Sequence, residues 1–237
     1  MHDQIAVIIP TYNEKENIVS LLKSILEILP SGRIFVVDDS SPDGTAFEVQ
    51  NLSYEDDRIR LIVRSQKEGL GSAYLDAFAR IIPDDSIRYL ITMDADFSHD
   101  PADLSRFLEH IEDYDLVIGS RYVSGGNVQN WNLSRRILSR VANIYAKTIT
   151  SVPIADLTAG FVSYEREILG RILTRFVKSD GYAFQIEMKY LAYQLGARIK
   201  EVPITFRERI NGKSKLLHGG IWEGISTPWQ LRLFRKL

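Results

Sequence analysis

The first half of the chain alternates short, continuous apolar runs with segments in which apolar residues recur every three or four positions. The continuous runs cover residues 5–9, 34–37, 59–63, 89–93 and 116–118. Such a run is typical of a strand covered on both faces, whereas the longer spacing is typical of an amphipathic helix. Strands that alternate with helices build βαβ units, so we expect an α/β fold with a mostly parallel central sheet flanked by helices.

The apolar spacing predicts helices at residues 16–29, from about 45, and at 69–82, 103–111, 135–150 and 184–195. The second half is less regular. A short strand is expected at 160–164, with extended segments at 199–202 and 204–206 on either side of Pro203. We find no internal repeat or linker, which favours a single domain over residues 1–217 followed by an amphipathic tail at 218–237.

The charge balance and the lack of cysteine exclude several classes of protein. The 237 residues include 29 Lys and Arg against 31 Asp and Glu, a net charge of -2. A general nucleic-acid binder is strongly basic, so we expect no nucleic-acid partner. Without cysteine, neither a disulfide nor a thiolate metal site can form. The first strand is not followed by Gly-x-Gly-x-x-Gly, and no Walker-type Gly-Lys-Ser occurs, which argues against dinucleotide oxidoreductases and P-loop enzymes.

The N-terminal residues lack the features of a targeting segment. Met1-His2-Asp3-Gln4 has neither a positive region nor a long apolar stretch. No window approaches the roughly 20 apolar residues of a membrane-spanning helix. We expect a cytoplasmic protein whose contact with a membrane is at most peripheral.

Carboxylates follow three of the expected strands, at Asn13-Glu14, Asp38-Asp39 and Asp94-Ala95-Asp96. In such sheets ligands bind beyond the carboxyl ends of the strands. Two carboxylates spaced as in Asp94-Ala95-Asp96 suit Mg²⁺, which takes few protein carboxylates and completes its shell with phosphate and water oxygens. The alternative is a solvated loop, which Asp-Ala-Asp in isolation favours. Its position at a strand end, near a second acidic strand end, favours the metal site.

The residues after the first two strands fit a nucleotide. A carboxylate at Asp39 suits ribose hydroxyls or a base edge, while Tyr12 could stack on a base and Glu14 could hydrogen-bond to it. Each has a structural alternative. Asp and Ser are common in turns and helix caps, and Asn13 or Thr11 could cap the following helix.

Taken in order, these motifs resemble those of the family-2 glycosyltransferases. They are Pro10-Thr11-Tyr12-Asn13-Glu14, Asp38-Asp39-Ser40-Ser41-Pro42-Asp43-Gly44-Thr45, Gly69-Leu70-Gly71-Ser72-Ala73 and Asp94-Ala95-Asp96. Later motifs narrow the resemblance to dolichol-phosphate (polyprenol-phosphate) mannose synthases: Ser120-Arg121-Tyr122, Asp156-Leu157-Thr158-Ala159-Gly160-Phe161, Gly181-Tyr182, Glu201-Val202-Pro203-Ile204 and Ser214-Lys215-Leu216. The resemblance runs from about residue 5 to residue 217.

The resemblance implies a GT-A, Rossmann-like fold and an inverting mannosyltransferase. The donor would be GDP-mannose, the acceptor a polyprenyl (dolichyl) phosphate, the cofactor Mg²⁺ or Mn²⁺, and the product a β-linked polyprenyl-phosphate mannose. A phosphate oxygen is already anionic near neutral pH, so this chemistry depends on positioning and on cations rather than on a strong base. A lipid acceptor implies contact with the cytoplasmic face of a membrane, made directly or through a membrane-anchoring subunit.

The resemblance also implies roles for individual residues. The donor would be bound by Pro10, Tyr12, Glu14, Asp39, Asp94, Ala95, Asp96, Arg121, Arg209 and Lys215, the last two from a loop near residues 207–217. The acceptor phosphate would be bound by Arg121, Arg135 and Ser139, and the metal by Asp94, Asp96 and Ser98. The catalytic group would be Asp94, Asp96, Arg121 and Arg135. Guanidinium groups suit phosphate because their planar fork matches its oxygens, although an isolated arginine more often forms a surface salt bridge.

More than one role is open to Ser98, His99 and Asp156. Some relatives carry Gln where this chain has Ser98, so a hydroxyl or a water would complete the metal shell. We interpret His99 as a structural or rim histidine. Asp156 would cap a turn, contact the sugar or orient an arginine.

The tail and the function each have alternatives. The tail around Trp222, Trp229 and Phe234 lies in a membrane interface or packs on the protein's own core, and residues 135–150 are a second candidate for the interface. A UDP-glucose or UDP-N-acetylhexosamine transferase acting on the same lipid class is an alternative activity. A non-catalytic nucleotide-sugar-binding subunit is an alternative of another class.

Overall fold

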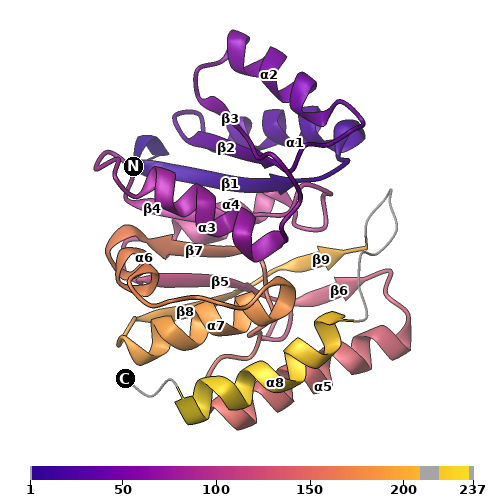
Figure 1. Cartoon of the computed structure of the whole chain (residues 1–237), viewed down its shortest axis with the longest axis vertical. Helices are drawn as coiled ribbons and strands as arrows, with labels where there is room; N and C mark the ends of the chain where they lie inside the picture. The colour runs from indigo at the N-terminus through magenta and orange to yellow at the C-terminus, as the bar shows by residue number, and fades with distance from the viewer. Residues whose placement is uncertain (1, 209–218, 235–237) are drawn as a thin grey trace.

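A computed structural model describes residues 2–208 and 219–234. Within them, a seven-stranded sheet has the order β3-β2-β1-β4-β7-β5-β8 (Figure 1). The strands are β1 (Ile5–Thr11), β2 (Arg33–Asp38), β3 (Ile59–Val63), β4 (Tyr89–Thr92), β5 (Leu116–Ser120), β7 (Val162–Glu165) and β8 (Ile199–Pro203). Of these seven, β7 alone runs antiparallel to its neighbours. The expected α/β fold with a mostly parallel sheet is confirmed.

Helices cover both faces of the sheet. The buried side chains of α1 (Lys15–Ile28), α2 (Thr45–Glu55) and α4 (Leu104–Leu108) pack on one face. Those of α3 (Leu70–Ile81), α6 (Arg166–Leu173) and α7 (Gly181–Gln194) pack on the other. The buried apolar side chains on the α1 face form a first cluster, and those on the α3 face form a second. Along β1, Ile5, Val7 and Ile9 belong to the first cluster, and Ala6 and Ile8 to the second. Strand side chains alternate between faces, so a strand covered on both faces has a continuous apolar sequence.

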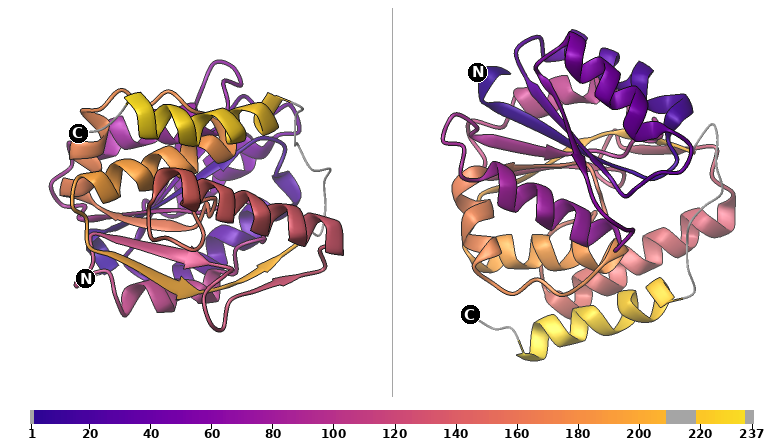
Figure 2. Two further views of the ribbon diagram at one scale, coloured as in Figure 1. Left: turned by 90° about the horizontal axis from the view of Figure 1, so that it is seen from below. Right: turned by 45° about the horizontal axis from the view of Figure 1, so that its top comes forward.

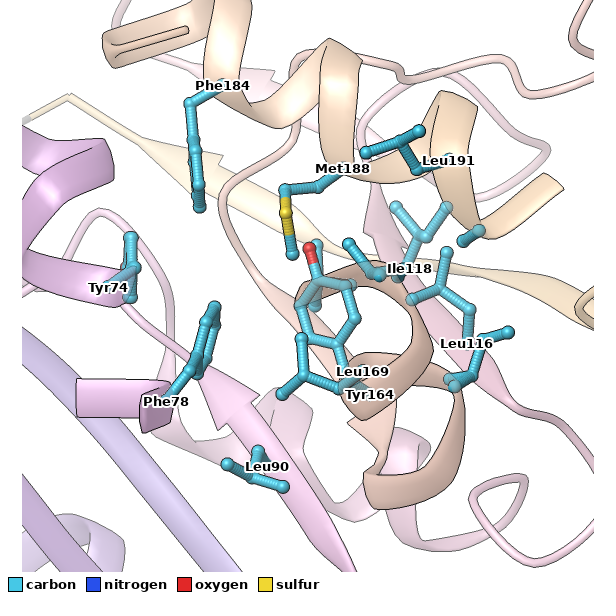
Figure 3. Close-up of a cluster of buried hydrophobic side chains, with 14 of the residues drawn as sticks. Tyr74, Phe78, Leu90, Leu116, Ile118, Tyr164, Leu169, Phe184, Met188 and Leu191 are labelled. Atoms are coloured by element: carbon cyan, nitrogen blue, oxygen red, sulfur yellow. The ribbon is translucent and has the colours of Figure 1, made fainter. Parts of the chain in front are cut away.

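Aromatic rings join α3 to α7 in the second cluster. The ring centroid of Tyr74 lies 5.9 Å from that of Phe78 and 5.9 Å from that of Phe184 (Figure 3). Phe78 also meets the ring of Tyr164 on β7 edge-on. Buried aromatic contacts of this kind stabilise the packing of a helix on a sheet. They fix α7 beside α3, and both helices begin at the same edge of the sheet.

The strands β1, β2 and β4 end side by side. Thr11 at the end of β1 pairs with Asp38 at the end of β2, and Ile8 of β1 pairs with Thr92 at the end of β4. This register brings the loops after the three strands to one edge, as the sequence predicts.

Some elements differ from the predicted ones. The helix α6 was not expected; it begins where the Glu165 carboxylate accepts hydrogen bonds from the backbone N–H groups of Glu167 and Ile168. The strand β6 (Asn127–Gln129), which pairs with β9 (Thr205–Arg207), was not expected either. The helix expected at 103–111 is shorter, a 3₁₀ turn at Pro101–Asp103 followed by α4.

The helices α5 (Leu133–Thr150) and α8 (Gly219–Phe234) lie side by side at one end of the molecule (Figures 1 and 2). The Asn132 side chain caps α5 by accepting from the Arg135 N–H. Leu231 of α8 is buried in the second cluster, and the Arg232 guanidinium donates to the Ile149 carbonyl at 2.9 Å. One side of the tail helix therefore packs on the protein. Among the described residues, no helix is long and apolar enough to span a membrane.

Candidate active site

A cavity of about 640 Å³ opens at the edge of the sheet where β1, β2 and β4 end. Nine residues predicted from the sequence line it: Pro10, Tyr12, Glu14, Asp39, Asp94, Ala95, Asp96, Arg121 and Arg135. Ser98 and Ser139 are not part of its lining. Arg209 and Lys215 lie outside the described residues. Carboxylates and arginines that are far apart in the sequence thus share one cavity.

The acidic pair, Asp94 and Asp96, follows β4 in a tight turn. Asp96 is 4% exposed, and its Oδ1 accepts from the Ser98 N–H at 3.0 Å. Asp94 is half-buried, and its backbone N–H donates to Nδ1 of His99 at 3.1 Å. Phe97 adopts a positive φ of 57°, which turns the chain sharply after Asp96. The turn holds both carboxylates at the cavity.

The imidazole ring of His99 supports this turn. Because its Nδ1 accepts a hydrogen bond, its imidazole proton resides on Nε2. Burial lowers the pKa of His99, although Asp94 opposes the shift, so the ring is neutral at physiological pH. The ring packs on Phe161 and Phe206, with centroids 5.0 and 5.4 Å away. His99 is a buried structural residue rather than a rim residue.

The acidic pair fits an ion that takes most of its ligands from elsewhere. Among residues 2–208 and 219–234, no group of three or more His, Cys, Asp or Glu side chains could hold a metal ion. Mg²⁺ binds through one or two carboxylates plus phosphate and water oxygens, and Asp94 and Asp96 match that requirement. The Ser98 hydroxyl beside them is buried and has no hydrogen-bond partner in the described part of the chain.

The two aspartates at the end of β2, Asp38 and Asp39, have different surroundings. Asp38 is fully buried, and its carboxylate accepts from the hydroxyls of Thr11 and Ser41. Asp39 lines the cavity, and its Oδ1 lies 2.9 Å from Nη1 of Arg64. Burial raises the pKa of Asp39, and the Arg64 guanidinium opposes that shift. Asp38 holds the turn together, whereas Asp39 faces the cavity.

Lys67 was not predicted from the sequence. Its Nζ lies 4.0 Å from the centroid of the Tyr12 ring, and both residues line the cavity. A cation over an aromatic face is attracted by the ring quadrupole. A planar base entering between them would exchange this contact for stacking.

The start of α3 contacts the start of α7 closely at Gly69 and Gly71. Gly69 has a φ of 100°, and a Cβ there would lie 1.9 Å from Oδ2 of Asp180, so only glycine fits. Oδ1 of Asp180 accepts from the Gly71 N–H at 2.5 Å. Gly69 and Asp180 both line the cavity. This contact forms part of the cavity wall.

Arg121 is held by a buried ion pair. Its Nε and Nη2 donate to the two carboxylate oxygens of Asp156, each at 2.7 Å, and Nη2 also donates to Thr158 Oγ1 at 2.8 Å. Burial alone raises the pKa of Asp156, but the guanidinium outweighs burial and lowers it. Of the three roles considered for Asp156, the structure shows that it orients an arginine. None of the described residues accepts a hydrogen bond from Nη1 of Arg121.

Arg135 approaches the cavity from the first turn of α5. Its guanidinium carbon lies 4.1 Å from the Trp131 ring centroid, and its Nη1 lies 3.0 Å from Oε1 of Glu208. Ser139, one turn further along α5, accepts from the Tyr122 hydroxyl at 2.7 Å. The structure brings Arg135 close to the Arg121 side of the cavity through Trp131, whose ring centroid lies 5.8 Å from the Arg121 guanidinium carbon.

Two further residues of the lining were missed. Trp131 and Gln185 are both buried, and Trp131 Nε1 and Gln185 Nε2 lack hydrogen-bond partners in the described ranges. Gln185 lies on α7, within the helix predicted at 184–195. Nothing in the helical spacing distinguishes it from a residue facing solvent. The neighbouring motif Gly181-Tyr182 was the one signal near it.

Comparisons with known proteins show what the whole chain is similar to. Residues 6–173 match the family described as Glycosyl transferase family 2. Polyprenol monophosphomannose synthase of Mycolicibacterium smegmatis is 44% identical over 234 residues, 95% of this chain and 86% of that protein. Undecaprenyl-phosphate mannosyltransferase of Micrococcus luteus is 40% identical over 230 residues, 96% of this chain and 94% of that protein.

Solved structures show the same fold at lower identity. Glucosyl-3-phosphoglycerate synthase of Mycobacterium tuberculosis, in complex with Mn²⁺, UDP and phosphoglyceric acid, has a TM-score of 0.69 and 20% identity. The match covers 97% of this chain and 78% of that one. A mannosyltransferase of Pyrobaculum calidifontis, in complex with GDP-Man and Mn²⁺, has a TM-score of 0.56 and 18% identity, covering 89% and 58%. These likenesses confirm the predicted GT-A fold class.

Proposed function

Because this chain belongs to glycosyl transferase family 2, we propose that it transfers mannose from GDP-mannose to a polyprenyl phosphate and forms a β-linked mannosyl phosphate. The names of the two bacterial relatives support this acceptor and this sugar. The observation that carries the proposal is the shared cavity, where Asp94 and Asp96 lie with Arg121 and Arg135. Transfer between two phosphate-bearing substrates requires cationic groups for both.

On the donor side, Pro10, Tyr12, Glu14 and Asp39 would bind the nucleotide at the ends of β1 and β2. Asp94 and Asp96, with Ala95 between them, would hold Mg²⁺ or Mn²⁺, and Ser98 is the candidate for a further ligand. The bound ion supplies Lewis-acid stabilisation of the charge on the leaving diphosphate. Arg209 and Lys215 stay predicted ligands of the same diphosphate.

On the acceptor side, Arg121 and Arg135 would hold the lipid phosphate, with Ser139 as a helper. An oxygen of that phosphate attacks the anomeric carbon, and the bond from this carbon to the diphosphate oxygen breaks with its electron pair. The product is inverted at that carbon. No proton has to move to the protein, because the attacking oxygen is already anionic. Asp156 keeps Nε and Nη2 of Arg121 engaged and so directs the remaining guanidinium edge. Positioning and electrostatics supply the catalysis.

The outer faces of α5 and α8 suit the surface of a membrane. Large apolar side chains are exposed there: Leu133, Ile137, Leu138, Val141 and Ile144 on α5, and Ile225, Trp229 and Leu233 on α8. Arg136 and Arg140 of α5 are also exposed. An amphipathic surface with basic groups binds the interface of an anionic bilayer. Since Arg135 sits on the first turn of α5, this surface would bring a lipid phosphate to the cavity at the cytoplasmic face.

Replacing Leu138 and Val141 together by glutamate is expected to weaken binding to vesicles of anionic phospholipid at least about tenfold, because apolar burial is lost and like charges repel. Cosedimentation measures this binding. The matched control replaces Phe47 and Tyr54, exposed apolar residues of α2 at the other end of the molecule, by glutamate. Equal binding by both double variants would contradict the proposed membrane face.

Chelation of divalent ions is expected to abolish transfer and to leave the fold intact. The two carboxylates bind no substrate diphosphate by themselves, so EDTA should stop product formation, and added Mg²⁺ or Mn²⁺ should restore it. Circular dichroism reports the fold in the same samples. Full activity in metal-free, EDTA-treated protein would exclude this role for the acidic pair.

The activity itself is tested with radiolabelled GDP-mannose, UDP-glucose and UDP-N-acetylglucosamine, each offered with a short polyprenyl phosphate and Mg²⁺. We expect lipid-soluble product from GDP-mannose and little from the UDP-sugars. If only a UDP-sugar gave lipid-soluble product, that UDP-sugar would be the donor instead of GDP-mannose. Donor binding without lipid product from any of them would indicate a non-catalytic subunit.

A further inference from the structure

The side-chain amide of Gln185, which lines the cavity, includes an unpaired donor. Gln185 is 3% exposed, and Nε2 has no hydrogen-bond partner among the described residues. Buried polar groups in native proteins almost always have partners, so an unpaired donor in a cavity wall calls for an explanation. A ligand acceptor would provide one.

Lys189 fixes which end of the amide faces the cavity. Its fully buried ammonium lies one helical turn along α7, where Nζ donates to the Ala159 carbonyl at 2.7 Å and to the Gln185 carbonyl and Oε1 at 3.3 Å each. An ammonium has three donors and no acceptor, and three oxygens surround this one. The atom facing Lys189 is therefore Oε1, which leaves Nε2 on the other side.

The space in front of Nε2 is bounded by a glycine. A Cβ built on Gly160 would lie 3.9 Å from Nε2 of Gln185, 3.8 Å from Oδ1 of Asp94 and 3.6 Å from Cε1 of His99. The lack of a side chain at Gly160 keeps room between the amide and the acidic pair. A group that accepts from Nε2 would therefore lie next to the metal-binding carboxylate.

Three parts of the substrates could occupy that place. The nucleotide would be bound by residues after β1 and β2, and the acceptor phosphate by the arginines. An anion is bound best by a cation, whereas an amide N–H suits a neutral hydroxyl. The part of the donor next to its diphosphate is the hexose, which carries neutral hydroxyls.

Resting on the proposed function, we infer that Nε2 of Gln185 donates a hydrogen bond to a hydroxyl oxygen of the donor's hexose, with Lys189 as the positioning residue that orients the amide. Gln185 then distinguishes a nucleotide that carries a sugar from one that does not. It acts on the sugar end of the donor alone.

The test compares the affinities of GDP-mannose and GDP, each with Mn²⁺, by isothermal titration calorimetry. The pH is 6.5, below the pKa of Lys189, which burial lowers to about 7. Gln185→Met removes the donor at similar volume. This variant is expected to bind GDP-mannose about tenfold more weakly and GDP within about twofold of wild type.

Two further variants complete the test. Gln194→Met, at the C-terminal end of the same helix and outside the cavity lining, should leave both affinities unchanged. Lys189→Met should lower the ratio of the GDP-mannose to the GDP affinity through the loss of amide orientation. A merely structural role would lower both affinities together.

The inference is overturned if Gln185→Met weakens GDP and GDP-mannose equally, or leaves GDP-mannose binding unchanged. The outcome does not depend on lipid transfer. If wild type binds GDP-mannose more tightly than GDP but makes no lipid product, the proposed transfer is wrong while the Gln185 comparison still decides the sugar contact.

Discussion

Asp96→Ala is expected to lower the rate of sugar transfer by about a hundred- to a thousandfold, the range seen when one electrostatic contact to a developing charge is lost. The carboxylate is one of the two that would hold the divalent ion against the diphosphate. Because Oδ1 of Asp96 also accepts from the Ser98 N–H, the alanine variant could lose activity through a disturbed turn. Single-turnover kinetics with saturating GDP-mannose and Mg²⁺ measure the effect.

Asp96→Asn separates the two causes. Its amide oxygen can still accept from the Ser98 N–H, but the charge that attracts the ion is gone. We expect a comparably large loss of rate for this variant. Asp113→Ala removes an exposed carboxylate outside the cavity lining and serves as the matched control, with activity near that of wild type. Wild-type rates for Asp96→Asn would show that the turn, and not the charge, matters.

Arg121→Met is expected to lower the free energy of unfolding by about 3–5 kcal/mol, because it leaves the carboxylate of Asp156 buried without its partner. Asp156 is fully buried and accepts both hydrogen bonds of the guanidinium fork. The same variant should weaken use of the polyprenyl phosphate much more than binding of GDP. Urea unfolding and steady-state kinetics with varied acceptor measure the two effects.

A double variant distinguishes support of the fold from contact with the acceptor. Arg121→Met combined with Asp156→Asn removes both charges. The asparagine keeps an oxygen that can accept from the backbone N–H of residue 121, as Oδ2 of Asp156 does at 3.0 Å. We expect the double variant to regain most of the lost stability, while its KM for the polyprenyl phosphate stays high. Recovery of acceptor use along with stability would mean that Arg121 acts only through the fold.

The sequence allowed the sheet and the residues at its edge to be predicted for a physical reason. Strands covered on both faces leave continuous apolar runs, and parallel strands end at one edge. The residues after β1, β2 and β4, including Tyr12, Asp39, Asp94 and Asp96, therefore had to lie near one another. The helix α6 was missed because eight residues are too few for a clear period, and its start depends on a cap from the Glu165 side chain.

Contacts between distant segments could not be predicted in this way. The pairing of Arg121 with Asp156 spans 35 positions, and Lys189 reaches a carbonyl 30 positions away. Neither contact has a local signature. Gln185 and Trp131 lie in the cavity wall because of the way that α7 and the β6–α5 loop pack, and their unpaired nitrogens can be recognised only in three dimensions.

The anomalous scattering of Mn²⁺ in crystals grown with GDP-mannose would locate the divalent ion in the cavity. If the acidic pair is the metal site, we expect one strong peak within coordination distance of the Asp94 and Asp96 carboxylates, with the donor's diphosphate oxygens completing the shell. A peak at any other place in the molecule, or a diphosphate bound away from these two side chains, would contradict it.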